Sequence, residues 1–309
     1  MRGDRRRAAG LAVAAARLAA AAIPLIAICA GIGAAVAGGG GAVAGVVAAG
    51  LLLAAVGAYC DRLALSAMLA RPVSEVEHPG LYRLVRELSK SGRLPVPRLY
   101  LSPAAQPNSF AVGRNPRTAA ICCTEGLLAS LDEAGLRGVL GHELAHISGR
   151  DILPATVSAG LATVITFPAG LTRFLPARAV WRAAAAPASP AAPGPAASGL
   201  GLVETSLMLV LGPIAALVIR LSVIREREYR ADAAGALLAG DPVALASALR
   251  QIEAGAAELA LAPDARLSSV GHLMIASPFH PEGFARLFGT HPPAGERVRR
   301  LEALAGYRR

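Results

Sequence analysis

The sequence predicts an α+β, mainly helical fold in which transmembrane helices accompany a domain with a small β-sheet. Three observations support this fold class. Hydrophobic residues make up 54% of the 309 residues and aromatic residues only 4%, a balance typical of membrane helices that pack through small side chains. Four long runs carry few or no charges. Between and after them, charged segments alternate with short stretches that have the pattern of strands and amphipathic helices.

Residues 1–60 are expected to form a hairpin of two transmembrane helices. The uncharged runs cover about residues 18–37 and 42–60, and each is long enough to cross a hydrocarbon core of roughly 30 Å. The glycines at 38–41 separate the two runs. A secretory signal peptide is the alternative for the first run. That run is too long for a signal-peptide core, however, and a second span follows it immediately, so the hairpin is favoured.

Residues 61–151 are expected to lie outside the membrane because charges return throughout this segment. An amphipathic helix is predicted over residues 79–90, where apolar residues recur on one face. Short strands are predicted over residues 98–102, 108–113 and 118–124. Together these segments would supply the small β-sheet of the fold class.

Residues 152–224 are expected to form a second apolar hairpin, with spans at about 152–172 and 201–224. Residues 173–199 between them are rich in Ala and Pro and are predicted to be a flexible linker rather than a helix. A re-entrant or surface-lying hairpin is the alternative for this pair of runs. Residues 225–309 would then form the second part of the domain outside the membrane, beginning with a helix that continues the fourth span.

The net charge of +10 favours membrane topology over nucleic-acid binding. The chain has no nucleic-acid motif and few aromatic residues for stacking on bases, and many of its basic residues flank the apolar runs. Four spans place both termini on one side. The arginines flanking the spans on that side are Arg2, Arg5, Arg6, Arg7, Arg62, Arg71, Arg150, Arg225 and Arg227, against Arg173, Arg178 and Arg182 opposite. This excess predicts that the termini and the charged domain face the cytoplasm.

A helix that begins near Ser130 is the first element with recognisable chemistry. Ser130 and Glu133 match a capping box, and Gly149 is a plausible end of the helix. The helix carries several charged residues and is therefore not a membrane span. This argues against an intramembrane protease whose metal-binding helix is buried in lipid.

The sequence His142-Glu143-Leu144-Ala145-His146 lies on this helix. Residues four apart share one face, so His142 and His146 are able to bind one zinc ion, and Glu143 is able to reach a water molecule held by the metal. The alternative is two solvated histidines beside a glutamate. This five-residue pattern alone does not decide between them.

A catalytic zinc ion usually takes three protein ligands and leaves one position for water. Glu228 and Asp232 are four residues apart on the helix that follows the fourth apolar run, so both would lie on one face. Glu228 would be a third ligand, and Asp232 would accept a hydrogen bond from a ligating histidine. The alternative, an ordinary charged helix start, is favoured by the spacing alone.

Three motifs occur in order along the chain: GHELAHISGRD at 141–151, EYRAD at 228–232 and HPPAGER at 291–297. Together they resemble the HtpX family of bacterial membrane-bound zinc proteases, which are related to CaaX prenyl endopeptidases. The resemblance covers nearly the whole chain, including the apolar hairpins. It implies that residues 61–151 and 225–309 form a zincin-like metalloprotease domain.

The resemblance also implies roles for individual residues. His142, His146 and Glu228 would bind one Zn²⁺ per subunit, and Glu143 would be the general base. His291 and Arg297 would stabilise the reaction intermediate; the alternative for residues 291–293 is a rigid turn before a helix.

The segment Asn108-Ser109-Phe110 matches a family Asn-Ala-Phe strand beside the cleft, with serine in place of alanine. It would bind the substrate peptide by strand pairing.

The implied function is zinc-dependent hydrolysis of misfolded or damaged membrane proteins, on the cytoplasmic side of the inner membrane. The expected partners are polypeptide substrates and the lipid bilayer, without nucleic acid. One alternative is a processing enzyme dedicated to a single membrane substrate. The other is a non-catalytic membrane scaffold with a relic metal site, which the intact catalytic positions disfavour.

Overall fold

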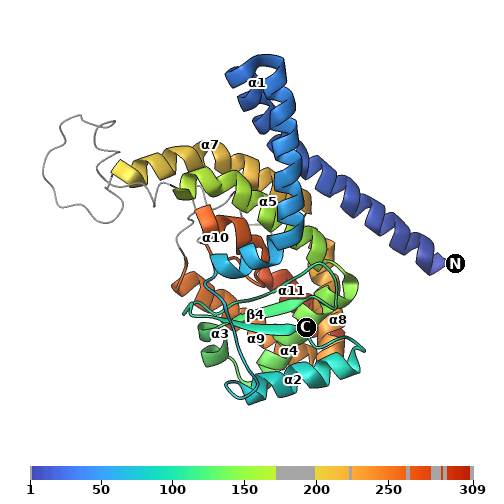
Figure 1. Cartoon of the computed structure of the whole chain (residues 1–309). Helices are drawn as coiled ribbons and strands as arrows, with labels where there is room; N and C mark the ends of the chain where they lie inside the picture. The colour runs from blue at the N-terminus through green and yellow to red at the C-terminus, as the bar shows by residue number, and fades with distance from the viewer. Residues whose placement is uncertain are drawn as a thin grey trace, which may run out of the picture.

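The computed structural model describes residues 2–171, 199–222, 225–261, 265–279, 287 and 291–306 (Figure 1). In chain order its elements are α1 (Arg2–Ala67), β1 (Arg71–Pro72), α2 (Pro79–Ser91), β2 (Arg98–Ser102), β3 (Ser109–Val112), β4 (Ala120–Thr124), α3 (Glu125–Ser130), α4 (Glu133–Gly149), α5 (Ile152–Leu171), α7 (Gly199–Ser222), α8 (Arg225–Ala239), α9 (Pro242–Glu258), α10 (Ala265–Val270), η2 (Gly271–Leu273) and α11 (Ala294–Leu304). The predicted fold class, mainly helical with a small sheet, is confirmed.

Helix α1 contains both predicted N-terminal spans and is divided by a kink. Ala37 and Gly38 have non-helical backbone angles, and Gly38 has a φ of 60°, a conformation that favours glycine. The two arms meet closely beside the kink, because a Cβ atom on Gly45 would lie 2.2 Å from the carbonyl oxygen of Cys29. The helix therefore folds back on itself at the glycine segment, as the sequence predicts.

The second apolar pair corresponds to α5 and α7, which pack against α1 in the upper part of Figure 1. Two helices, α1 from Ala22 and α5, are long and apolar enough to cross a membrane. A third candidate joins Thr205–Arg220 to α8 across a bend of 54°. The structure thus has two to three candidate helices for the four spans that the sequence predicts, because α1 alone contains the first two predicted spans. The predicted linker at 173–199 lies, except for its last residue, outside the described residues.

The bend between α7 and α8 corrects the expectation that α8 continues the fourth span. The two helices differ in direction by 54° instead of forming one rod. Helix α7 carries only two charged residues, Glu204 and Arg220, whereas α8 is rich in charge from Arg225 onward, so the apolar and charged segments point in different directions.

The sheet has the strand order β1-β2-β4-β3, and the three strands predicted from the sequence are confirmed. Strand β2 runs parallel to β4, whereas β3 pairs antiparallel with β4 and forms one edge. Ala111 and Cys123 face the main core, which α2, α4 and α9 cover. Phe110 and Cys122 face the opposite side, toward the end of α1 and toward α5.

Helix α4 begins later than the capping box at Ser130 predicts. Its N-cap is Asp132, whose side chain accepts a hydrogen bond from the backbone N–H of Gly135. Ser130 instead ends α3, and its hydroxyl donates to the carbonyl of Leu127. Aspartate is an effective N-cap, and its negative charge suits a helix N-terminus. The sequence correctly predicts that a helix begins in this region, but the N-cap residue is Asp132, two residues after Ser130.

Candidate metal centre

Helix α4 presents His142 and His146 from one face, as their spacing predicts. The two Nε2 atoms lie 3.1 Å apart, and the rings meet edge to face at 84°. His142 is almost fully buried and His146 is partly buried. Most of α4 packs into the main core, which fixes the direction of both rings.

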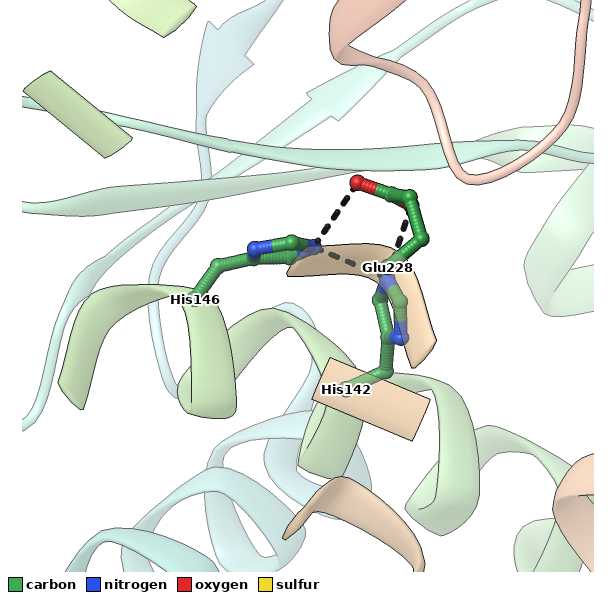
Figure 2. A group of neighbouring side chains, drawn as sticks. All are labelled: His142, His146 and Glu228. Carbon is green, nitrogen blue, oxygen red and sulfur yellow. Dashed lines mark hydrogen bonds and ion pairs between the residues drawn. The ribbon is translucent and has the colours of Figure 1, made fainter. Parts of the chain in front are cut away.

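Helix α8 brings Glu228 to the same point from the opposite side (Figure 2). Glu228 Oε2 lies 4.0 Å from His142 Nε2, and Glu228 Oε1 lies 3.6 Å from His146 Nε2. The two helices approach closely through glycine. A Cβ atom on Gly235 would lie 2.5 Å from the backbone nitrogen of His142, and one on Gly141 would lie 2.6 Å from the carbonyl oxygen of Gly235.

The three side chains form a group that is able to hold a metal ion, with one donor atom from each residue lying within 4.8 Å of the others. In tetrahedral zinc sites, donor atoms about 2.0–2.2 Å from the ion lie about 3.3–3.5 Å from one another. The measured separations of 3.1, 3.6 and 4.0 Å bracket this value. Two imidazoles and one carboxylate, with a further position left open, also have the donor chemistry of catalytic zinc sites.

Asp232 lies directly behind His142, one helical turn from Glu228. Its Oδ1 atom is 2.9 Å from His142 Nδ1. This contact favours a proton on Nδ1, which leaves the lone pair of Nε2 facing Glu228 and His146. Burial lowers the pKa of His142, but the contact with Asp232 outweighs it, so the pKa is raised. The predicted partner of a ligating histidine is therefore in contact with one.

The pKa values of the other two residues of the group, His146 and Glu228, depend on burial and on each other's charge. Burial lowers the pKa of His146 to about 4, partly opposed by the charge of Glu228. Burial alone would raise the pKa of Glu228. The neighbouring His146, His291 and His142 outweigh it and hold this pKa well below its ordinary value. A neutral imidazole and an ionised carboxylate are the protonation states that bind a metal ion.

Glu143 lies beside the two histidines on α4 and is 2% exposed. Its Oε1 atom accepts a hydrogen bond of 2.6 Å from the hydroxyl of Ser109 on β3. Burial raises the pKa of Glu143, although His142 and Ser109 oppose this. A raised pKa makes a carboxylate a stronger base, which suits a residue that takes a proton from water.

Comparison with known proteins agrees with this geometry. The model of peptidase family M48 matches residues 75–305 of the chain. The chain belongs to peptidase family M48, and it is of the HtpX type.

Among its relatives, the protease HtpX homolog of Kineococcus radiotolerans is 54% identical over 248 residues, which is 80% of each chain. The homolog of Paenarthrobacter aurescens is 48% identical over 254 residues, covering 80% of this chain and 79% of the relative. The crystal structure of S. mikatae Ste24p aligns with a TM-score of 0.37 at 17% identity, over 75% of this chain and 50% of that one.

His291 of this M48 peptidase lies next to the metal-binding group. Its Nδ1 atom is 3.5 Å from Glu228 Oε2, and its side chain is 9% exposed. Apart from this contact, neither ring nitrogen makes a hydrogen bond within the described part of the chain. A buried imidazole beside the third ligand, with an Nε2 atom that has no hydrogen-bond partner among the described residues, is close enough to contribute to the site.

Arg297 differs from the expectation that it contacts the reaction intermediate. Its Nε and Nη2 atoms donate to the two carboxylate oxygens of Asp232 at 2.8 and 2.7 Å, and Nη1 donates to the carbonyl of Ile275 at 2.7 Å. Each guanidinium nitrogen is thus bonded to a protein oxygen. Arg297 therefore lies behind Asp232 and fixes its carboxylate, and this carboxylate in turn contacts His142 Nδ1.

The predicted substrate strand lies beside the site, but its side chains are buried and occupied. Asn108 bonds to the backbone of Ala276 through both its amide nitrogen and its oxygen, and Phe110 packs in the core. The carbonyl of Ser109 accepts a hydrogen bond from Ile275 N–H at the outer edge of β3. Alternation along an antiparallel strand also turns the backbone groups of Ala111 outward, so Ala111 is the next position where a substrate strand could pair.

The bond between Ser109 and Glu143 was not among the contacts that the sequence predicted. The signal was a hydroxyl at a position where the family pattern has none. Its meaning depends on the distance between β3 and α4, which the sequence alone does not give.

Proposed function

We propose that this HtpX-type M48 peptidase is a zinc endopeptidase that cuts misfolded or damaged membrane proteins on the cytoplasmic side of the inner membrane. The observation that carries the proposal is the convergence of His142, His146 and Glu228 beside the buried carboxylate of Glu143. The apolar helices α1 and α5 would hold this site near the bilayer, where membrane proteins are accessible.

When bound, a zinc ion would lower the pKa of its water to about 7 and polarise the scissile carbonyl. Glu143 would take the proton from the attacking water and then pass it to the leaving amine. Its burial supports the first step, because a carboxylate with a raised pKa accepts the proton readily. Asp232 and Arg297 would keep the ring of His142 in one orientation throughout the reaction.

His291 would donate a hydrogen bond to the oxygen that becomes negatively charged during attack. Its buried position beside Glu228 and its Nε2 atom, which has no hydrogen-bond partner in the described part of the chain, support this role. For the substrate, we retain Asn108, Ser109 and Phe110 as the strand that lines the cleft. Pairing at Ser109 would require Ile275 to move away from the edge, whereas pairing at Ala111 would not.

The direct test compares the wild type with Glu143→Gln, both purified in detergent, for zinc content and for cleavage of casein. We expect the variant to keep its zinc, because Glu143 is not a ligand, and to lose cleavage, because an amide does not accept the proton. Zinc retained together with wild-type cleavage would remove Glu143 from the mechanism.

The substrate class is tested separately in proteoliposomes that contain the protease and a membrane protein in either its folded or a destabilised form. We expect the destabilised form to be cut faster, because unfolding exposes backbone to the cleft. Equal rates for both forms, with cleavage confined to one sequence, would favour a dedicated processing enzyme instead.

A further inference from the structure

The hydroxyl of Ser109 donates a 2.6 Å hydrogen bond to Glu143 Oε1 in a site that solvent barely reaches. Ser109 is 0% exposed and Glu143 is 2% exposed. A hydrogen bond to a carboxylate is stronger than one between neutral groups, and in a buried site no water competes for the acceptor.

The backbone of Ser109 is fixed by hydrogen bonds and by strand pairing, and this sets the position from which its hydroxyl reaches Glu143. The residue pairs with Cys123 in the register of β3 and β4. On the outer edge, its carbonyl accepts a bond from Ile275 N–H, and its N–H donates to Asn108 Oδ1. Both backbone groups of Ser109 are therefore hydrogen-bonded on the outer edge, and the register with β4 fixes the strand on its other side.

Within the described residues no other hydrogen bond fixes the carboxylate of Glu143, and the terminal torsion of a glutamate side chain is broad. A donor on Oε1 selects one orientation of the carboxylate and leaves Oε2 as the oxygen that takes a proton. We propose that Ser109 is a positioning residue that orients Glu143 for proton transfer. This proposal rests on the role of Glu143 as general base.

The replacement Ser109→Ala removes only the hydroxyl oxygen and is therefore expected to leave the fold intact.

The test measures kcat, KM and zinc content with casein as substrate for the full chain in detergent. For Ser109→Ala we expect kcat to fall roughly ten- to a hundredfold, the range found when groups that orient a metal site are removed. We expect KM, zinc content and melting temperature to stay close to the wild-type values. Ser109→Thr keeps the hydroxyl and is expected to recover most of kcat.

The matched control is Ser89→Ala, which also removes a buried serine hydroxyl. Ser89 lies on α2, far from the site in the chain, and its hydroxyl has no hydrogen-bond partner among the described residues. This variant is expected to keep the wild-type kcat. A loss of activity common to both variants would contradict the proposal, since it would reflect packing rather than the bond to Glu143.

The outcomes separate this proposal from the one on which it rests. If Glu143→Gln is inactive but Ser109→Ala keeps the wild-type kcat, the positioning role is wrong and the general base stands. If Ser109→Ala raises KM alone, Ser109 binds substrate and does not position the base. If Glu143→Gln is itself active, the role of Glu143 fails and the positioning role fails with it.

Discussion

At the scale of single residues, the metal centre depends on charges that are buried in pairs. Burial alone would raise the pKa of Asp232, but Arg297 and His142 outweigh it and lower this pKa to about 2. The same contacts orient His142. A variant at either Asp232 or Arg297 is therefore expected to affect both stability and metal binding.

The pKa of Asp232 predicts a pH dependence of stability in the metal-free protein. Because the folded-state pKa lies below the ordinary value of 3.8, the contribution is complete above that value and is lost as the pH falls towards about 2. A shift of this size corresponds to about 2 kcal/mol. Thermal unfolding in detergent measures this contribution. The melting temperature of the wild type should exceed that of Asp232→Asn at about pH 4, and the difference should disappear as the pH falls to about 2. A constant difference between the two proteins across that range would contradict the assignment.

Arg297→Ala is expected to destabilise the protein strongly because it leaves the carboxylate of Asp232 buried without its partner. Removing one member of a buried ion pair costs about 3–5 kcal/mol. The control is Arg299→Ala on the same helix, where the side chain is largely exposed and the cost should stay within about 0.5 kcal/mol. Similar melting temperatures for the two variants would show that the buried pair contributes little.

At the scale of elements, the close contact of α4 with α8 sets the distance between the histidines and Glu228. Gly235 permits this contact, since even a methyl group there would overlap the backbone of His142 and Gly141. On the same helix Ala231 is also buried, whereas Ala234 is exposed.

Gly235→Ala is therefore expected to push α8 away from α4 and to lower zinc content and melting temperature together. Gly295→Ala is the matched control, because a Cβ atom at Gly295 would meet nothing within 4 Å. Alanine in place of glycine in a helix stabilises by roughly 0.5–1 kcal/mol, so the control should melt no lower than the wild type. Full zinc content in Gly235→Ala would mean that the helix spacing does not control the site.

The elements also indicate which signals in the sequence were sufficient. Strong local patterns located the strands, the amphipathic α2 and the helix of His142 correctly. The capping box was misplaced because Ser130 and Asp132 are both capable caps, and the choice depends on where α3 ends. The prediction that α8 continues the fourth span was wrong, because a bend between two helices depends on packing and leaves little trace in the hydrophobicity of the sequence.

The site was predicted from the sequence where a motif fixes both residue type and spacing. His142 and His146 follow from helical geometry alone. Glu228 needed the family resemblance, since 82 residues separate it from His146 and only the fold brings them together. The bonds of Arg297 to Asp232 and of Ser109 to Glu143 join distant segments with no shared pattern, so they required coordinates.

At the scale of the whole molecule, the apolar helices and the charged domain have main cores of their own, and a third core joins them where the end of α1 and α5 meet the sheet. Helices α1, α5 and α7 share one core, and the sheet with α2, α4 and α9 forms another. Large apolar side chains on α1 are exposed, among them Val36 and Leu51, which suits contact with lipid. We expect the metal centre to lie in the part of the chain outside the spans.

This arrangement predicts opposite sides of the membrane for the α1 kink and for the charged domain. A cysteine introduced as Gly40→Cys, near the kink, should react with a membrane-impermeant maleimide from outside intact cells. Val76→Cys, on an exposed part of the charged domain, should react only in inside-out vesicles. The reverse pattern would place the metal centre outside the cytoplasm. The wild type, with its own four cysteines, gives the background.

The most direct test of the central claim is metal analysis of the purified full-length chain. We propose that three side chains from two helices bind a single ion, so we expect about one zinc ion per chain in the wild type. Almost none is expected in His146→Ala and in Glu228→Ala. A wild type without bound metal, or a Glu228→Ala variant with the full wild-type content, would contradict the assignment of the site.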